Sequence, residues 1–229
     1  MIEQCNICGN KKFVQQNVLW MQLISDWKLS DYELEYINKQ QGCCCAACNS
    51  NIRSMALASA ITNVCHFDGL FAGFVKKWKY RNFKILEINA AGNLHELLRL
   101  MKYHTFVEFP ECDMLSMNKF NDDTFDFVIH SDTLEHVTDP VKGLRECCRV
   151  LKPNGHCIFT IPIIVDRLSR SRKGMPESYH GNTNIHSEDF VVHTEFGADA
   201  WKYVLEAGFK NVSIHALDYP AGLAIEAIK

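Results

Sequence analysis

Two cysteine pairs near the amino terminus have the spacing of metal ligands. The chain holds eleven cysteines among 229 residues, and the pairs are C-x-x-C motifs formed by Cys5 with Cys8 and by Cys45 with Cys48. Glycine or asparagine follows each pair, and these residue types adopt a left-handed backbone most easily, so the chain can turn after the second ligand. Because four thiolates suit tetrahedral zinc, the motifs predict a structural zinc site.

Other interpretations of these cysteines stay open. Cys43 or Cys44 could replace Cys45 after a small shift in register. The thiols could also be buried without a metal, or act in redox chemistry, although neither pair lies between a strand and a helix as in thioredoxin-like units. The segment between the pairs is longer than in the simplest zinc ribbons, so we expect it to contain structure of its own.

A second set of polar residues follows an apolar run in the middle of the chain. Residues 125–129 are apolar except for one aspartate, and His130, Ser131 and Asp132 come directly after them. A buried parallel strand would deliver these side chains to its carboxyl end, where open α/β sheets bind ligands. A helix is predicted over 140–151, because Asp139-Pro140 is a typical helix start.

The elements around this segment alternate between strands and helices, which favours an α/β fold. Further strands are predicted at 83–88, 105–108, 157–163, 212–216 and 222–228, with a short one at 114–115, and helices at 93–102 and within 51–79. We expect three parts: a cysteine-rich zinc-ribbon-like module over residues 1–50, a helical connector over 51–82 and a larger domain over 83–229.

The segment FDFVIHSDTLEHVTDP, followed by RVLKPNG, resembles the class I S-adenosylmethionine-dependent methyltransferases. The resemblance extends over residues 83–229. It implies a Rossmann-like, seven-stranded, mostly parallel sheet with helices on both faces and an antiparallel carboxyl-terminal strand. It also implies S-adenosylmethionine as the cofactor and methyl transfer as the reaction.

In this family the cofactor lies against a glycine-rich turn after the first strand, with the pattern E-x-G-x-G-x-G. The matching residues run from Glu87 through Asn89 and Gly92 to Asn93. Only Gly92 is a glycine, and it is out of phase with the pattern. Asparagine tolerates the left-handed backbone better than other non-glycine residues, so the turn can survive, and Glu87, Asn89 and Gly92 are cofactor-binding candidates.

The resemblance assigns further cofactor contacts to the ends of later strands. Glu108 would accept hydrogen bonds from the ribose hydroxyls, since a carboxylate has two oxygens for that contact. Asp113 and Met114 would meet the adenine, and His130 and Ser131 the methionine end. A solvated strand-end glutamate and a core methionine are the plain alternatives for Glu108 and Met114.

Methyl transfer to a hydroxyl benefits from a base that removes its proton. His180 and His193 are the candidates, because they lie in or beside a long polar loop that follows the predicted strand 157–163. Four cations between positions 167 and 173 could bind phosphate or carboxylate on an acceptor.

The composition and charge of the chain limit the kinds of partner that we expect. The net charge of -3 argues against nucleic acid as a partner, and no apolar run reaches the length of a membrane span. The amino terminus lacks the pattern of a secretory leader, so we expect a cytoplasmic protein. A small-molecule acceptor, such as a sugar or nucleotide-linked sugar, is favoured. The alternatives are an RNA or protein methyltransferase that recognises its substrate through the cysteine module, and a non-enzymatic binding protein that kept the fold. No residue pattern indicates an oligomeric state.

Overall fold

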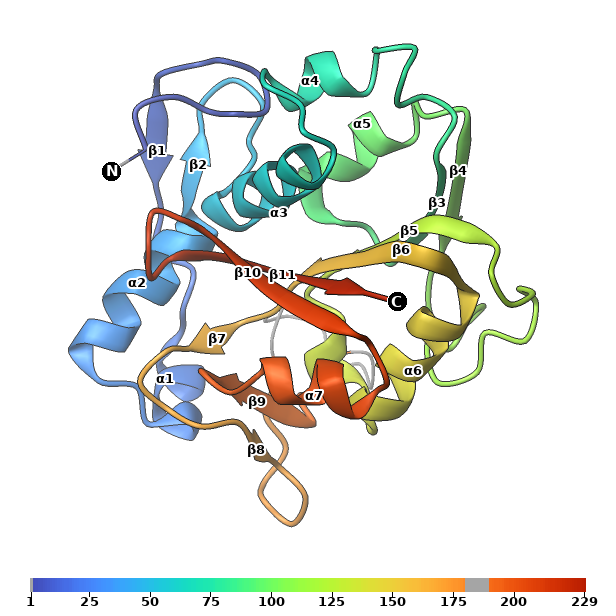
Figure 1. Cartoon of the computed structure of the whole chain (residues 1–229). Coiled ribbons are helices and arrows are strands. Elements are labelled where there is room, and N and C mark those ends of the chain that lie inside the picture. Colours follow the sequence, from blue (N-terminus) through green and yellow to red (C-terminus); the bar gives the residue numbers. More distant parts are fainter. Residues whose placement is uncertain (1, 180–189) are drawn as a thin grey trace.

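A six-stranded mixed sheet forms the centre of the molecule (Figure 1). The computed structural model describes residues 2–179 and 190–229. In the sheet the strands follow the order β10-β11-β6-β5-β3-β4. Their bounds are Lys84–Ile88 for β3, Tyr103–Val107 for β4, Phe125–Ser131 for β5, Leu151–Thr160 for β6, Asn211–Leu217 for β10 and Gly222–Ile228 for β11.

The direction of the strands places four carboxyl ends along one edge. β3 pairs in parallel with β4 and β5, and β5 pairs in parallel with β6. β11 runs antiparallel to β6 and to β10, so the expected antiparallel carboxyl-terminal strand is present. This mixed sheet with helices on both faces is Rossmann-like. Polar residues that follow β3, β4 and β5 therefore meet at one edge of the sheet.

The seventh strand implied by the resemblance is absent from the described residues. The strand predicted at 114–115 is a turn, because the Asp113 carboxylate accepts a hydrogen bond from the Leu115 N–H at 2.8 Å and the Ser116 N–H bonds to the Asp113 carbonyl at 3.0 Å. Such side-chain-capped turns consume the backbone donors that a sheet ladder would use.

Helices cover both faces of the sheet (Figure 1). On one side lie α3 (Ile52–Val64), α4 (Phe71–Phe74) and α5 (His95–Leu98); on the other lie α6 (Pro140–Val150) and α7 (Trp201–Glu206). The helix predicted over 93–102 is shorter than expected, a 3₁₀ turn, η1 (Gly92–Leu94), followed by α5. A second 3₁₀ turn, η2 (Leu134–His136), follows β5.

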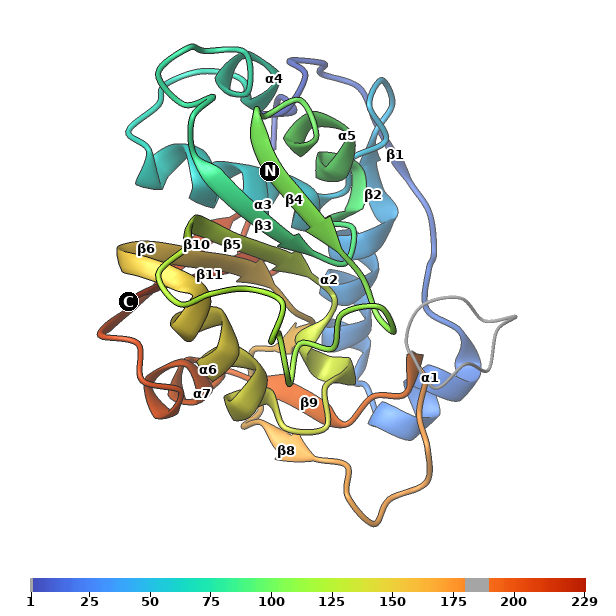
Figure 2. The same cartoon turned by 90° about the vertical axis from the view of Figure 1, so that its right-hand side faces the viewer.

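The helix predicted after Asp139 is confirmed as α6. The Asp139 carboxylate caps it by accepting a hydrogen bond from the Lys142 N–H at 2.9 Å. Pro140 occupies the first turn, where its missing N–H is not needed. Leu144, Cys147 and Val150 are fully buried against the sheet. α6 therefore covers the face of the sheet below β5 and β6 (Figure 2).

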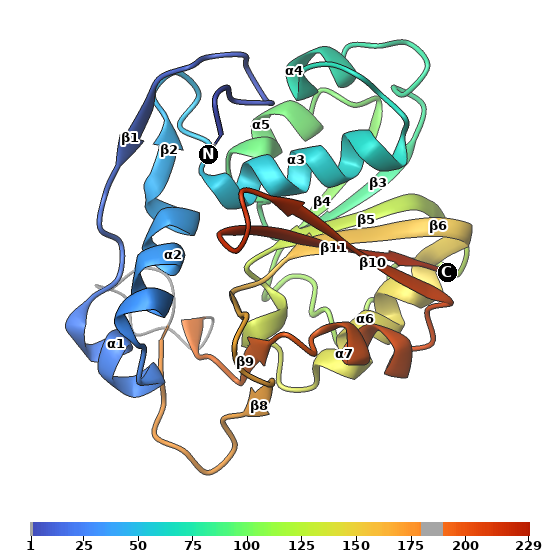
Figure 3. The same ribbon diagram turned by 60° about the vertical axis from the view of Figure 1, so that its left-hand side comes forward.

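The segment between the cysteine pairs contains two helices, as expected. β1 (Phe13–Gln15) pairs antiparallel with β2 (Cys43–Cys45), and α1 (Met21–Trp27) and α2 (Asp31–Gly42) lie between them. Ser30 and Glu33 form a capping box that starts α2. Both helices pack beside a small three-stranded sheet (Figure 3), made of β7 (Ile163–Ile164), β8 (Arg170–Ser171) and β9 (Thr194–Gly197).

The packing of the amino-terminal segment joins it to the rest of the molecule. Cys5 and Cys45 belong to the same buried cluster as Met55 of α3 and Ile85 of β3. The domain boundaries proposed at residues 50 and 82 stay predictions. Among the described residues, every helix is too short or too polar to cross a lipid bilayer.

Candidate active site

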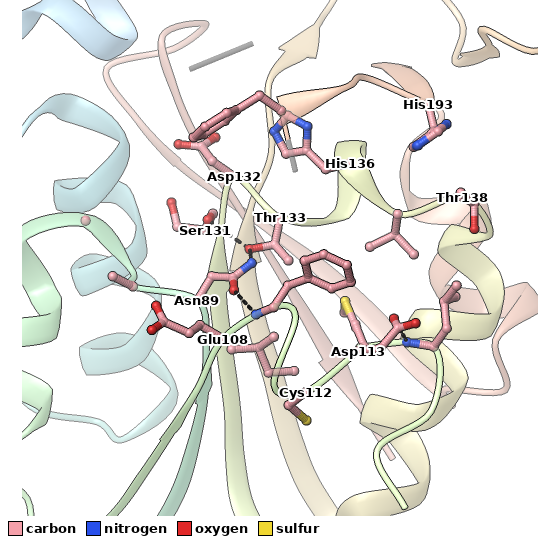
Figure 4. Close-up of a pocket in the computed structure, with 18 of the residues that line it drawn as sticks. Asn89, Glu108, Cys112, Asp113, Ser131, Asp132, Thr133, His136, Thr138 and His193 are labelled. Atoms are coloured by element: carbon pink, nitrogen blue, oxygen red, sulfur yellow. Dashed lines mark hydrogen bonds between the residues drawn. The ribbon is translucent and has the colours of Figure 1, made fainter. Parts of the chain in front are cut away.

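A cavity of about 680 Å³ opens at the carboxyl ends of β3, β4 and β5 (Figure 4). This volume lies within the range of roughly 300–1,000 Å³ that is common for small-molecule sites. Seven of the predicted site residues line it. They are Asn89, Gly92, Glu108, Asp113, Met114, Ser131 and His193.

Asn89 joins the ends of three strands. It follows β3 with a φ of 55°, the left-handed conformation expected for this turn. Its side-chain oxygen accepts a hydrogen bond from the Phe109 N–H at 3.2 Å, and its side-chain nitrogen donates to Thr133 Oγ at 3.3 Å (Figure 4). The asparagine thus has the backbone geometry of a glycine and adds two contacts that a glycine lacks.

Glu87 supports the same turn from behind and does not line the cavity. Its side chain is fully buried, and one carboxylate oxygen accepts a hydrogen bond from the Ala91 N–H at 2.8 Å. The other oxygen contacts His104 Nε2 at 2.7 Å and His95 Nδ1 at 2.9 Å. Burial alone would raise the pKa of Glu87, but the His104, Ala91 and His95 contacts together lower it. Glu87 therefore holds the turn as a carboxylate.

Gly92 lies where α3 approaches the turn. Its φ is +55°, and a Cβ added there would come within 2.9 Å of Ser54 Oγ. A side chain would therefore be strained by the backbone and crowded by α3. The single glycine of the turn thus lies where φ is positive and a side chain would crowd Ser54.

Two carboxylates and a thioether lie on the cavity wall after β4. Glu108 is exposed to solvent at the end of the strand. Asp113 uses one oxygen in its turn with Leu115. Met114 is almost fully buried and packs against Gly143 of α6. Acidic and apolar surfaces thus lie side by side in this wall.

Of the two residues predicted at the end of β5, Ser131 lines the cavity and His130 lies in the core. Ser131 lines the cavity, and its hydroxyl pairs with the Thr160 hydroxyl at 2.8 Å. The His130 side chain does not reach the cavity, because it is fully buried and stacks on Phe159 with ring centroids 4.6 Å apart. Alternation along the strand sends these neighbours to opposite faces.

An ion pair that the sequence did not predict lies beside the cavity. Asp132 lines it with a φ of 50° and pairs with Arg53, a fully buried residue of α3. Burial lowers the pKa of Arg53 to about 10, against the opposing charge of Glu135. Gln41 of α2 also lines the cavity. No local pattern marks Arg53 or Gln41, because only tertiary packing brings them to the sheet edge.

Two histidines lie on the wall opposite Glu108 (Figure 4). His136 Nδ1 lies 3.0 Å from the Val191 carbonyl oxygen, to which it donates, and His193 lies in the segment that leads into β9. Burial, and then the nearby His136, lower the pKa of His193. His193 is thus a neutral imidazole over a wider pH range than a free histidine. The other predicted base, His180, lies outside the described residues.

The cations predicted to bind an acceptor are mostly engaged within the protein. Arg167 donates to the Glu33 carboxylate at 2.6 Å, and Arg170 and Arg172 both pair with Glu195. These contacts fix the loop to α2 and β9. Of the four cations, only Lys173 has an exposed side chain with no ion pair among the described residues. The described part of the loop is thus a structural support, and its three arginines are occupied by carboxylates of the protein.

The four predicted metal ligands come together in one cluster. The Cys5 and Cys48 sulfurs lie 3.7 Å apart, and the Cys8 and Cys45 sulfurs 3.5 Å apart. Zinc–sulfur bonds of about 2.3 Å in a tetrahedron separate the sulfurs by about 3.8 Å. The residues after the two pairs, glycine at position 9 and asparagine at position 49, have φ values of 84° and 56°, as predicted.

The electrostatics differ among the cysteines of the cluster, because burial raises the pKa of the Cys5 and Cys8 thiols. Burial opposes ionisation of Cys45, but hydrogen bonds from the Cys48 and Ala47 N–H groups help to lower its pKa to about 6. Cys44 contacts the Gln41 carbonyl and, like Cys43, stays outside the group of four. The described residues thus favour the ligand set with Cys45 over its shifted alternatives.

Comparison with known proteins shows that part of the chain is similar to methyltransferases. Residues 69–159 match the family model described as "Methyltransferase domain". The ubiquinone biosynthesis O-methyltransferase of Aliivibrio fischeri is 32% identical over 63 residues, which are 28% of this chain and 27% of that protein. The demethylmenaquinone methyltransferase of Clavibacter sepedonicus is 46% identical over 59 residues, 24% of each chain. The chain thus spans about a quarter of the length of these curated relatives.

Solved methyltransferase structures show a weaker likeness over a longer stretch. A methyltransferase of Thermotoga maritima is 15% identical with a TM-score of 0.43, covering 78% of this chain and 90% of that chain. The 1,6-didemethyltoxoflavin-N1-methyltransferase of Burkholderia thailandensis is 16% identical with a TM-score of 0.42, covering 76% and 78%. Likenesses at this level do not identify an activity.

Proposed function

We propose that the protein is an S-adenosylmethionine-dependent methyltransferase that acts on a small molecule. The single observation that carries the proposal is the cavity at the ends of β3, β4 and β5, lined by seven of the residues predicted from the sequence. The match of residues 69–159 to a methyltransferase domain supports the same reaction. The matched segment contains all three of these strands.

The side chains of the cavity fit the chemistry of the cofactor. Among the described residues, none makes a hydrogen bond to the Glu108 carboxylate, so its oxygens can accept from the ribose hydroxyls. Asp113 and Met114 offer an acceptor and an apolar surface for the adenine. Asn89 and Gly92 let the backbone of the turn approach the ligand closely. We assign Ser131 and the backbone of His130 to the methionine end, and Glu87 to support of the turn.

S-adenosylmethionine supplies an activated methyl group, so the protein must chiefly orient the acceptor and exclude water. Asp132, His136 and His193 line the part of the cavity that remains for an acceptor. We assign His193 the removal of a proton from an acceptor hydroxyl, because its lowered pKa keeps it in the basic form. His180 stays a second candidate.

Aromatic residues that line the cavity favour one chemical class of acceptor. Phe109 and Phe190 line the cavity together with Val137, and aromatic walls suit planar or ring-shaped ligands. The relatives from Aliivibrio fischeri and Clavibacter sepedonicus carry names of quinone-pathway methyltransferases. We therefore place phenolic or quinol-type acceptors ahead of the sugars that the sequence alone favoured.

We further propose a structural zinc ion held by Cys5, Cys8, Cys45 and Cys48. The support is the near-tetrahedral spacing of the four sulfurs. Zinc would crosslink β2 to the amino-terminal residues and so fix the start of α3.

Calorimetric titration of the full chain with S-adenosylmethionine tests cofactor binding. Incubation with methyl-labelled cofactor and panels of phenols, quinols and nucleotide sugars then tests methyl transfer. Micromolar binding and label transfer to one small-molecule class are expected. Absence of binding at millimolar cofactor would favour a non-enzymatic binding protein instead. Transfer only to RNA or protein would favour the alternative in which the cysteine module recognises a macromolecule.

A further inference from the structure

A second group of metal-type ligands lies in the core, apart from the four cysteines. His130 of β5, Cys147 of α6 and Cys157 of β6 bring one nitrogen and two sulfurs within 4.8 Å of one another. All three side chains are 0% exposed. Cys147 and Cys157 belong to the buried cluster that also contains Leu144 and Val150 of α6.

His130 is the unusual member of this group. Among the described residues, neither of its ring nitrogens has a hydrogen-bond partner, although both are buried. A buried polar group without a partner costs on the order of 1–3 kcal/mol. The ring is held by stacking on Phe159, with planes 13° apart. An apolar residue would fill this space without that free-energy cost. The buried imidazole therefore indicates a ligand that its ring nitrogens could bind.

We propose that His130, Cys147 and Cys157 bind a zinc ion. Two thiolates would balance the charge of Zn²⁺, and together with the neutral imidazole they supply three of the four ligands of a tetrahedral zinc site. Metal–ligand bonds of about 2.0–2.3 Å place the ligand atoms of a tetrahedral site about 3.3–3.8 Å apart, and the three atoms here lie within 4.8 Å of one another.

Metal binding would replace the thiol protons of this group. Burial lowers the pKa of His130 to about 3, so its imidazole is neutral and has a free lone pair. Burial raises the pKa of the Cys147 thiol, which is therefore protonated without a metal. Binding breaks two S–H bonds, forms two S–Zn bonds and releases two protons to solvent, with no change in oxidation state.

The ion would tie together the two central strands and the helix below the cavity. Because the ligands are fully buried, the ion must enter while the chain folds. Zinc content can be measured without acceptor or cofactor, so a failure of this proposal is distinguishable from a failure of the proposed methyl transfer.

The experiment measures zinc in the full chain, produced in zinc-supplemented medium and also refolded with zinc chloride under reducing conditions. Two zinc ions per chain are expected in the wild type. One is expected in His130→Phe, which keeps the ring stacking, and in Cys147→Ala. Cys148→Ser is the matched control and should keep two, because Cys148 neighbours Cys147 but lies outside both groups.

X-ray absorption separates the two sites by their ligands. The wild type should average three sulfurs per zinc, from one site with four and one with two, and His130→Phe should average four. One zinc per chain with four sulfurs in both wild-type preparations would overturn the proposal. Two zinc ions that survive in both His130→Phe and Cys147→Ala would overturn it as well.

Discussion

The side-chain amide of Asn93 donates a hydrogen bond to the Cys48 carbonyl at 3.3 Å, so the cysteine cluster touches the turn proposed to bind the cofactor. Ser54 of α3 approaches Gly92 in the same turn. The amino-terminal segment is therefore part of the wall behind the cavity. Its integrity and that of the cofactor turn should depend on each other.

Loss of the metal from the four-cysteine cluster should weaken cofactor binding. Cys48→Ser removes a ligand and loosens the contact with Asn93, so we expect S-adenosylmethionine affinity to fall by about tenfold or more in calorimetry, a cost of about 1.4 kcal/mol. Cys44→Ser is the matched control, since Cys44 lies outside the cluster. Unchanged affinity in a Cys48→Ser protein shown to lack zinc would contradict the coupling.

Removal of the charge on Glu108 should weaken cofactor binding without affecting stability. Hydrogen bonds to charged groups contribute about 1.5–3 kcal/mol, so Glu108→Gln should bind S-adenosylmethionine about 10- to 100-fold more weakly. Glu111→Gln, an exposed neighbour that does not line the cavity, should bind like the wild type. Equal affinities of the two variants would rule out the ribose contact.

Substitution of Gly92 should lower both the stability of the protein and its affinity for the cofactor. Gly92→Ala and Gly174→Ala both place alanine at positive φ, and each should lower the free energy of unfolding in urea by about 1–2 kcal/mol. Only Gly92→Ala also crowds Ser54 Oγ, because nothing lies within 4 Å of a Cβ at Gly174. Cofactor affinity should fall in the first variant alone; a similar fall in both would point to global destabilisation.

The pH dependence of turnover should report the environment of His193. Burial and His136 lower its pKa from the ordinary value of 6.5, so the basic form persists into more acidic solution. The acid-side fall in kcat/KM should therefore occur below pH 6.5. His193→Ala should lower kcat about 100-fold and remove this limb, while cofactor affinity stays within about twofold. A profile identical to that of the wild type would exclude His193 as the base.

The carboxylate of Glu226 should contribute to stability in mildly acidic solution. Hydrogen bonds from His156 and His215, at 2.8 and 2.9 Å, lower its pKa to about 2, although burial acts in the opposite direction. Because the folded state holds the carboxylate more firmly than the unfolded state, the stabilisation is present above pH 4.5 and is lost as the pH falls toward about 2.

Glu226→Gln tests this contribution. The variant should lose up to about 3 kcal/mol in urea unfolding at neutral pH, with a flatter dependence on pH between 4.5 and about 2. Glu206→Gln, an exposed carboxyl on α7, should follow the wild-type pH curve. Parallel curves for wild type and Glu226→Gln would show that the histidine contacts contribute little.

Elements with local signals could be predicted from the amino-acid pattern. The proline after Asp139 and the apolar spacing that follows it predicted α6, and the C-x-x-C motifs predicted the cluster of four cysteines. The polar residues after β5 predicted which edge of the sheet would hold the cavity. These features depend on neighbours within a few positions, so their patterns can be recognised along the chain.

Tertiary structure alone decided which distant residues complete the site. Arg53 comes from α3 to Asp132, and Glu33 and Glu195 bind the loop arginines that the sequence offered to a ligand. His130 faces the core, beside cysteines from another strand and a helix. No spacing rule connects residues so far apart in sequence, because their partnership arises only when sheet and helices bury a common interface.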